Sequence, residues 1–194
     1  MMYYLGRFIC FLASRCLFPI KVFGRERIPK KGAFILASNH VSYLDPIVLG
    51  IACPRKISFM ARHDLFSGRL LSWVLLSIGV FPVKRDYADL SALKIALRRL
   101  KNSAGLALFP EGTRGSAGIN NEPQPGIGFL AAKASVPVIP AFVKGTDLAL
   151  PKGGRFIRRA RVTVHFGRQI LIERRMPYQD IAQLIMANIR SLSC

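Results

Sequence analysis

Residues 33–46 read AFILASNHVSYLDP and combine a strand signal with a helix start. The first six of them form a short apolar run after the turn signal PKKG at residues 29–32, which predicts a buried strand. Asp45 suits the N-cap of a following helix, and Pro46 suits its first position. We therefore expect a strand that ends in a polar turn and leads into a helix.

The remaining chain alternates short apolar runs with stretches of helical length. Further strands are expected at residues 57–61, 80–83, 105–109, 136–143 and 162–166. Helices are expected in the apolar run that leads into residue 80, at residues 87–102 and 127–135, and after Pro177. Strands separated by helices indicate an α/β fold with a mostly parallel or mixed central sheet flanked by helices. A chain of 194 residues fits one such domain.

Residues 1–20 read MMYYLGRFICFLASRCLFPI and are apolar, but Arg7 and Arg15 interrupt them. A helix that spans a bilayer needs about 20 mostly apolar residues, and no small-residue cleavage site follows this segment. The pattern favours an amphipathic helix that lies in the membrane interface, with its arginines directed toward phosphate headgroups. An ordinary packing helix of the core is the alternative.

The chain is strongly basic, with 29 Lys and Arg against 10 Asp and Glu and a formal net charge of +19. Such a charge predicts an anionic partner, which could be nucleic acid, a membrane surface or an acidic substrate or carrier. The charges are not gathered in runs of five or six, and no nucleic-acid-binding motif occurs. Because 51% of the residues are hydrophobic, an anionic membrane surface fits better than nucleic acid.

The cysteines and histidines do not suggest a metal site. Cys10, Cys16, Cys53 and Cys194 form no C-x-x-C pair and no cluster with a histidine, which favours free thiols in a reducing compartment. His63 is assigned to the surface, and His165 to an apolar strand. We expect no bound metal.

His40 and Asp45 lie five positions apart, at the expected turn between strand and helix. On one ideal helix they would point about 140° apart, whereas a strand-to-helix turn can fold the carboxylate back onto the imidazole. That contact would stabilise the protonated ring and leave its other nitrogen as a general base. No G-x-S-x-G nucleophile is present. The group that such a base would most naturally deprotonate is therefore a substrate hydroxyl, which then attacks an activated acyl group. A structural histidine satisfied by a capping aspartate is the alternative.

A second polar segment closes another expected strand. Residues 109–114 read FPEGTR and offer backbone N–H groups, the Thr113 hydroxyl and the Arg114 guanidinium. Such a loop binds phosphate through a backbone nest and charge-assisted hydrogen bonds. Arg62 and Arg85 also follow expected strands and could reach the same anion. A solvated turn or a surface charge is the alternative for each of these groups.

Four sequence blocks occur together in one order. They are N-H-x-S-x-x-D at residues 39–45, G-V-F-P-V-K-R at 79–85, F-P-E-G-T-R at 109–114 and V-P-V-I-P at 136–140. In these blocks the chain resembles the 1-acyl-glycerol-3-phosphate acyltransferases, the PlsC-type branch of the glycerolipid acyltransferases.

The resemblance implies a role for each block. His40 would be the base that acts on the acceptor hydroxyl, and Asp45 would be its partner. Pro140 would belong to the hydrophobic wall around the acyl chain. The phosphate end of the acceptor would be bound by Arg85, Glu111, Gly112, Thr113 and Arg114, and also by Arg62, where many members carry lysine. Residues 1–20 would be the membrane-associating helix, and residues 21–194 the acyltransferase domain.

The implied function is transfer of a fatty acyl group from acyl-CoA or acyl-ACP to the sn-2 hydroxyl of lysophosphatidic acid, which gives phosphatidic acid for phospholipid biosynthesis. No cofactor beyond the acyl donor is expected. The protein would act as a monotopic or peripheral protein on the cytoplasmic face of the cell membrane. Alternatives are another lysophospholipid acceptor, or a noncatalytic basic protein that binds lipid or nucleic acid.

The surplus basic residues have two interpretations. They could hold anionic lipid, or they could receive an acidic acyl carrier protein or the phosphates of coenzyme A. The residues concerned are Lys94, Arg98 and Arg99 on the helix at 87–102, and Arg155, Arg158, Arg159 and Arg161 before the last strand.

Overall fold

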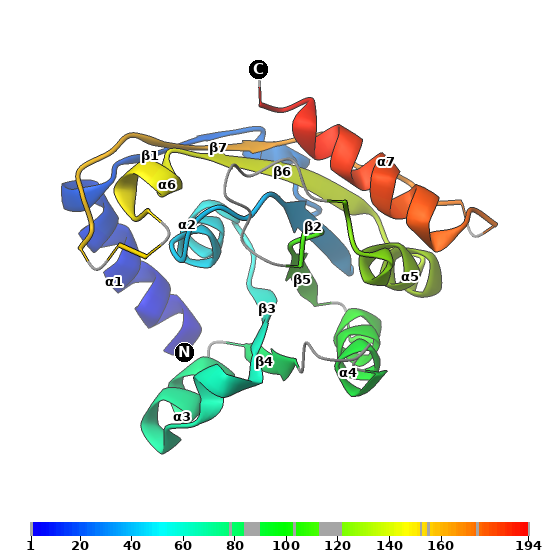
Figure 1. Ribbon diagram of the computed structural model, residues 1–194, viewed down its shortest axis with the longest axis horizontal. Helices are drawn as coiled ribbons and strands as arrows, with labels where there is room; N and C mark the ends of the chain where they lie inside the picture. The colour runs from blue at the N-terminus through cyan, green and yellow to red at the C-terminus, as the bar shows by residue number, and fades with distance from the viewer. Residues whose placement is uncertain are drawn as a thin grey trace.

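A seven-stranded sheet runs through the centre of the computed structural model, in the order β1-β7-β6-β2-β5-β3-β4 (Figure 1). The structure describes residues 2–77, 79–83, 90–102, 104–112, 122–151, 153–154, 156–173 and 175–193. The strands are β1 (Ile20–Phe23), β2 (Phe34–Ser38), β3 (Ile57–Arg62), β4 (Val80–Val83), β5 (Gly105–Leu108), β6 (Val138–Lys144) and β7 (Val162–Phe166). Only the β6–β7 pair is antiparallel among the pairs that join these strands. The expected α/β fold with a mixed central sheet is confirmed.

Helices cover both faces of the sheet. One face carries α2 (Asp45–Ala52), with α1 (Met2–Leu17) and α6 (Thr146–Ala149) on the same side, and the other carries α4, α5 and α7 (Figure 1). Their bounds are Leu90–Lys101 for α4, Pro125–Ala134 for α5 and Tyr178–Arg190 for α7, and α3 (Arg69–Ser77) leads into β4. Two short 3₁₀ turns, η1 (Arg25–Arg27) and η2 (His63–Phe66), complete the described elements.

The central strand β2 is buried along its whole length, which explains its continuous apolar sequence. It pairs in parallel with β5 on one side and with β6 on the other. Since the carboxyl ends of parallel strands meet at one edge, the turns after β2 and β5 open at the same edge of the sheet. This edge is where residues 39–45 and the described residues 109–112 of the second polar segment are positioned.

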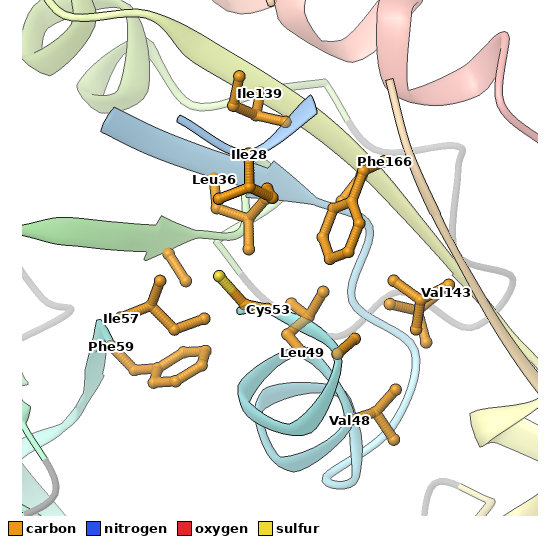
Figure 2. Close-up of a cluster of buried hydrophobic side chains, with 14 of the residues drawn as sticks. Ile28, Leu36, Val48, Leu49, Cys53, Ile57, Phe59, Ile139, Val143 and Phe166 are labelled. Atoms are coloured by element: carbon orange, nitrogen blue, oxygen red, sulfur yellow. The ribbon is translucent and has the colours of Figure 1, made fainter. Parts of the chain in front are cut away.

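The core between the sheet and α2 is built from buried aliphatic and phenylalanine side chains. Figure 2 shows Leu36 and Ile139 of the sheet facing Val48 and Leu49 of α2. Cys53 lies among them, and burial raises the pKa of its thiol, so it behaves as a small apolar residue. Packing of α2 at this place holds the start of the helix beside the end of β2.

Two local features differ from the expectations, and a third expectation lies partly outside the described residues. Asp45 is the first residue of α2 rather than its N-cap, which is Leu44, a residue that makes no side-chain capping hydrogen bond. The start of the helix expected at residues 87–102 lies in part outside the described residues. Arg99 was grouped with the basic residues that could hold anionic lipid, a carrier protein or coenzyme A, but its Nη1 donates to Ser58 Oγ at 2.9 Å and its guanidinium lies 4.7 Å from the centre of the Phe81 ring.

The N-terminal segment forms the expected helix, but a strand follows it directly. α1 ends at Leu17, and Ile20 begins β1, which pairs with β7 at the edge of the sheet. One side of α1 packs on the domain, where Tyr3 and Ser14 are buried, and Arg7 Nη2 donates to the Ile51 carbonyl at 3.1 Å. Arg7 is thus bound to the end of α2 instead of being wholly directed outward.

The opposite side of α1 is apolar and open to solvent. Tyr4, Leu5, Phe8, Ile9, Phe11 and Leu12 are all between 42% and 60% exposed. Within the described part of the chain, no helix has both the length and the apolar character that a bilayer crossing requires.

Candidate active site

The His40–Asp45 contact forms in the turn between β2 and α2. His40 Nδ1 lies 2.8 Å from Asp45 Oδ2, and the side chains are 12% and 0% exposed. The strand ends at Ser38 and the helix starts at Asp45, so the chain reverses between the two residues. The predicted contact between the Asp45 carboxylate and the His40 imidazole is confirmed.

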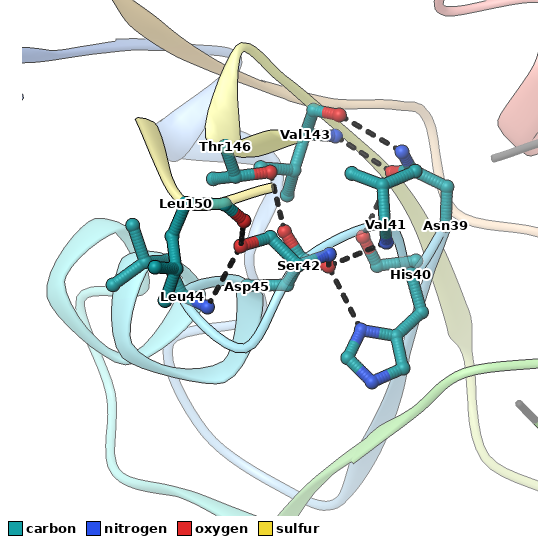
Figure 3. A network of polar contacts seen from close by, with 10 residues as sticks. Asn39, His40, Val41, Ser42, Leu44, Asp45, Val143, Thr146 and Leu150 are labelled. Atoms are coloured by element: carbon teal, nitrogen blue, oxygen red, sulfur yellow. Dashed lines mark hydrogen bonds and ion pairs between the residues drawn. The ribbon is translucent and has the colours of Figure 1, made fainter. Parts of the chain in front are cut away.

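The Asp45 carboxylate accepts hydrogen bonds from four donors (Figure 3). Besides His40 Nδ1, its Oδ2 accepts the backbone N–H groups of Val41 at 2.7 Å and Ser42 at 2.8 Å. Its Oδ1 accepts the Thr146 hydroxyl at 2.6 Å. A fully buried carboxylate requires such complete pairing, because an unpaired charge inside a protein is costly.

These partners also determine which nitrogen of His40 carries the hydrogen. Oδ2 acts as an acceptor for two backbone N–H groups, so it also accepts from Nδ1–H. Nε2 then keeps its lone pair, and in Figure 3 it points away from the hydrogen-bonded network. This is the tautomer that a general base needs.

The other polar residues of the first block hold the turn in place. The Asn39 amide forms two hydrogen bonds with Val143 of β6, donating to its carbonyl and accepting from its N–H, both at 2.8 Å. The Ser42 hydroxyl donates to the Leu150 carbonyl at 2.8 Å. These contacts tie the His40 turn to the end of β6 and to the chain that follows it.

Thr146 is a site residue that sequence reasoning missed. It follows Gly145, whose φ of 88° is suited to glycine and where a Cβ would collide with the Arg161 carbonyl oxygen. This tight turn after β6 places the Thr146 hydroxyl against Asp45, although the two residues are 101 positions apart. A glycine followed by a hydroxyl residue at the end of a strand was the only available signal, and it does not name a partner.

The second block reaches the first through Phe109. Its ring stacks on the His40 imidazole, with centroids 4.1 Å apart and planes 18° apart. The chain then turns: Gly112 N–H donates to the Phe109 carbonyl at 3.0 Å, and Gly112 has a φ of 65°. Glu111 in this turn is 3% exposed. The structure therefore brings His40, Asp45, Glu111 and Gly112 to one edge of the sheet.

The remaining predicted site residues are placed less completely. Thr113, Arg114 and Arg85 lie outside the described residues. Arg62 is the last residue of β3, a strand parallel to β5, so its backbone is at the edge where the 109–112 turn lies; its side chain is outside the described part. Pro140 is buried in β6 beside Ala37, and a Cβ on Gly167 would come within 2.7 Å of its Cγ. A role for Pro140 in binding the acyl chain stays a prediction.

Known proteins are similar to this chain in sequence and in fold. The chain is 31% identical over 127 residues to the 1-acyl-sn-glycerol-3-phosphate acyltransferase of Bacillus subtilis (strain 168), which covers 65% of this chain and 63% of the relative. It is 33% identical over 148 residues to the protein of that name from Streptococcus pneumoniae (strain ATCC BAA-255 / R6), covering 75% of this chain and 53% of the relative. The chain thus spans less than two thirds of the length of either relative.

The fold is that of a solved structure, the 1-acyl-sn-glycerophosphate (LPA) acyltransferase PlsC from Thermotoga maritima. The TM-score is 0.83 at 22% sequence identity, over 99% of this chain and 80% of the other. The family model described as Acyltransferase matches residues 19–144, a range that contains both polar segments and the strands that position them. The chain therefore belongs to the acyltransferase family.

Proposed function

We propose that this protein transfers a fatty acyl group from a thioester donor to the sn-2 hydroxyl of lysophosphatidic acid, giving phosphatidic acid. Family membership supports acyl transfer, and the names of the two bacterial relatives suggest the acceptor. The observation that carries the proposal is the His40 imidazole, which contacts Asp45 at 2.8 Å and stacks on Phe109 at the start of the FPEGTR block. The donor in this proposal is acyl-CoA or acyl-ACP.

The proposed reaction is direct acyl transfer with His40 as the base. Nε2 takes the proton from the acceptor hydroxyl while its oxygen attacks the thioester carbonyl, forming the new C–O bond. The tetrahedral intermediate collapses, the C–S bond breaks, and the imidazolium returns the proton to the leaving thiolate. Asp45 stabilises the imidazolium between these two steps. No acyl-enzyme intermediate is required.

A phosphate clamp would hold the acceptor in line with His40. We assign this role to the turn of Glu111 and Gly112, to the following Thr113 and Arg114, and to Arg85 and Arg62. The stacking of Phe109 on His40 supports the assignment, because it joins the start of that turn to the base. Correct placement of two reactants lowers a barrier by about 7–11 kcal/mol, more than a general base contributes.

Membrane contact is the second part of the proposal. Residues 1–20 would lie on the membrane and residues 21–194 would carry the reaction, with the boundary at the start of β1. The exposed apolar side of α1 supports this division. The net charge of +19 adds attraction to an anionic surface, and it would also suit an acidic acyl carrier protein.

The decisive assay supplies purified protein with lysophosphatidic acid and, in separate reactions, acyl-CoA or acyl-ACP. Phosphatidic acid is then measured by mass spectrometry. We expect product with at least one donor. Lysophosphatidylcholine and lysophosphatidylethanolamine are the matched acceptors, and faster acylation of either would contradict the assigned substrate while leaving acyl transfer intact.

Arg114→Ala is expected to lower kcat/KM for lysophosphatidic acid by about 10–100-fold, because a charge-assisted hydrogen bond to phosphate is worth roughly 1.5–3 kcal/mol. The measurement is repeated with monoacylglycerol, an acceptor without phosphate. There the variant and the unmodified protein should differ little. An equal loss with both acceptors would show that Arg114 does not act on the phosphate.

Thr146→Val is expected to lower kcat by about tenfold while KM changes little, because the hydroxyl that orients Asp45 is replaced by a methyl group of similar size. Thr146→Ser is the matched variant, since it keeps the hydroxyl and should restore most of kcat. Thermal melting of both variants separates this effect from a loss of stability. An unchanged kcat in Thr146→Val, or a kcat in Thr146→Ser as low as in the valine variant, would exclude a role for the hydrogen bond.

A further inference from the structure

A cavity lies away from the His40 site, between α1, β1 and the end of α2. Its volume is about 770 Å³, within the range of roughly 300–1,000 Å³ that is typical of small-molecule sites. The residues that line it do not include His40, Asp45, Phe109, Glu111 or Gly112. A ligand in this cavity would therefore not be the acceptor held beside His40.

The cavity is lined by three arginines, Arg7, Arg15 and Arg25, and no acidic residue is found among the described residues of its wall. Arg7 uses one N–H group on the Ile51 carbonyl at 3.1 Å, and a guanidinium has five such donors. Glu26 follows Arg25 in sequence, but its carboxylate lies 3.8 Å from Arg27 Nε. Three like charges around one cavity favour an anion with several acceptor oxygens, which describes a phosphate group.

The rest of the lining is aromatic and aliphatic. Tyr4, Phe8 and Phe11 of α1 line the cavity while remaining 59%, 57% and 42% exposed. These rings belong both to the cavity and to the open apolar side of α1. Inorganic phosphate has no apolar group that could cover these rings, whereas the acyl chains of a lipid would bury them.

We propose that this cavity binds the phosphate headgroup and the upper part of the acyl chains of an anionic membrane phospholipid, which is not the substrate. The phosphate contacts the three arginines, and the chains leave the cavity along Tyr4, Phe8 and Phe11 into the bilayer. The bound lipid then holds α1 in one orientation on the membrane. The proposal rests on the membrane contact proposed for α1 but not on acyl transfer.

The test compares two double variants that remove the same charge. Arg15→Gln/Arg25→Gln changes two arginines of the cavity and leaves Arg7 on the Ile51 carbonyl. Lys21→Gln/Lys30→Gln changes two exposed lysines nearby that do not line the cavity. Binding to equimolar phosphatidylcholine–phosphatidylglycerol vesicles is measured by co-sedimentation, without an acyl donor. We expect at least about 100-fold weaker binding for the arginine pair, which loses charge-assisted hydrogen bonds to the phosphate. The lysine pair loses only diffuse charge, so its binding should weaken by about 30-fold at most.

A soluble probe separates a lipid site from an anion site. Short-chain phosphatidylglycerol below its micelle concentration should bind saturably at one site in calorimetry, and the arginine pair should abolish this binding. Inorganic phosphate at the same concentration should show none. Equal losses in the two double variants would reduce the effect to diffuse surface charge and overturn the proposal, as would equal binding of phosphate and lipid. Because turnover is not measured, failure here leaves the proposed acyl transfer untouched, and loss of that activity leaves this site untouched.

Discussion

Replacing His40 by alanine is expected to lower turnover by about 10³-fold or more, while lysophosphatidic acid still binds. The imidazole is the proposed base, and general-base catalysis contributes roughly 10²–10⁴ in rate. Binding is spared because the phosphate clamp belongs to other residues. Steady-state kinetics with the preferred donor measure the first effect, and calorimetry with lysophosphatidic acid measures the second.

The fold should survive this change. Asp45 keeps three of its four donors, namely Val41 N–H, Ser42 N–H and the Thr146 hydroxyl. His40→Asn is the sharper variant, since its amide nitrogen can still donate to Asp45 but cannot serve as a base. His63→Ala, which removes an exposed histidine, is the control and should retain activity. Full activity in either His40 variant would remove the proposed mechanism.

Asp45→Asn is expected to lower kcat by about 10³-fold with little loss of stability. The asparagine oxygen can replace Oδ2 and accept the same three N–H groups, and its NH₂ group can donate to the Thr146 hydroxyl, which rotates. What disappears is the negative charge next to the imidazolium. At about 4 Å and an effective dielectric constant of about 20, that attraction is worth roughly 4 kcal/mol, or about 10³ in rate.

Asp45→Ala provides the contrast. It leaves two backbone N–H groups and the Thr146 hydroxyl without their acceptor in a buried place, at a cost of about 1–3 kcal/mol for each group. The alanine variant should therefore melt at a lower temperature, whereas the asparagine variant should melt close to the unmodified protein. Unchanged kcat in Asp45→Asn would show that the charge does not assist His40.

Local patterns predicted most of the sheet. Strands β2 to β7 were all expected within one or two residues of their observed bounds, because each is a short apolar run between turn signals. β1 was not expected. It is an edge strand that alternates partly buried residues with the exposed Lys21 and Phe23, directly after an apolar helix, so its four residues carry no separate signal.

The candidate site was predicted only as far as local sequence reaches. The five-residue spacing of His40 and Asp45 already implied their contact, since the turn between β2 and α2 is short. The expected helix-capping role of Asp45, in contrast, was wrong. Its carboxylate instead accepts hydrogen bonds from the backbone N–H groups of Val41 and Ser42 and from the hydroxyl of Thr146. Those competing donors become visible only when the chain is folded.

The sequence by itself determined the alternation of strands and helices, the His40–Asp45 contact and the family. The alternation and the contact follow from the spacing of apolar and polar residues over a few positions, which acts before any distant segment is in place. The family follows from the resemblance carried by the four sequence blocks. Only the tertiary structure decided that Phe109 stacks on His40, that Thr146 binds Asp45, and that three arginines share a cavity under α1. Parallel strands far apart in the chain end at one edge of the sheet, and contacts made across that edge depend on strand order and register, which no local pattern encodes.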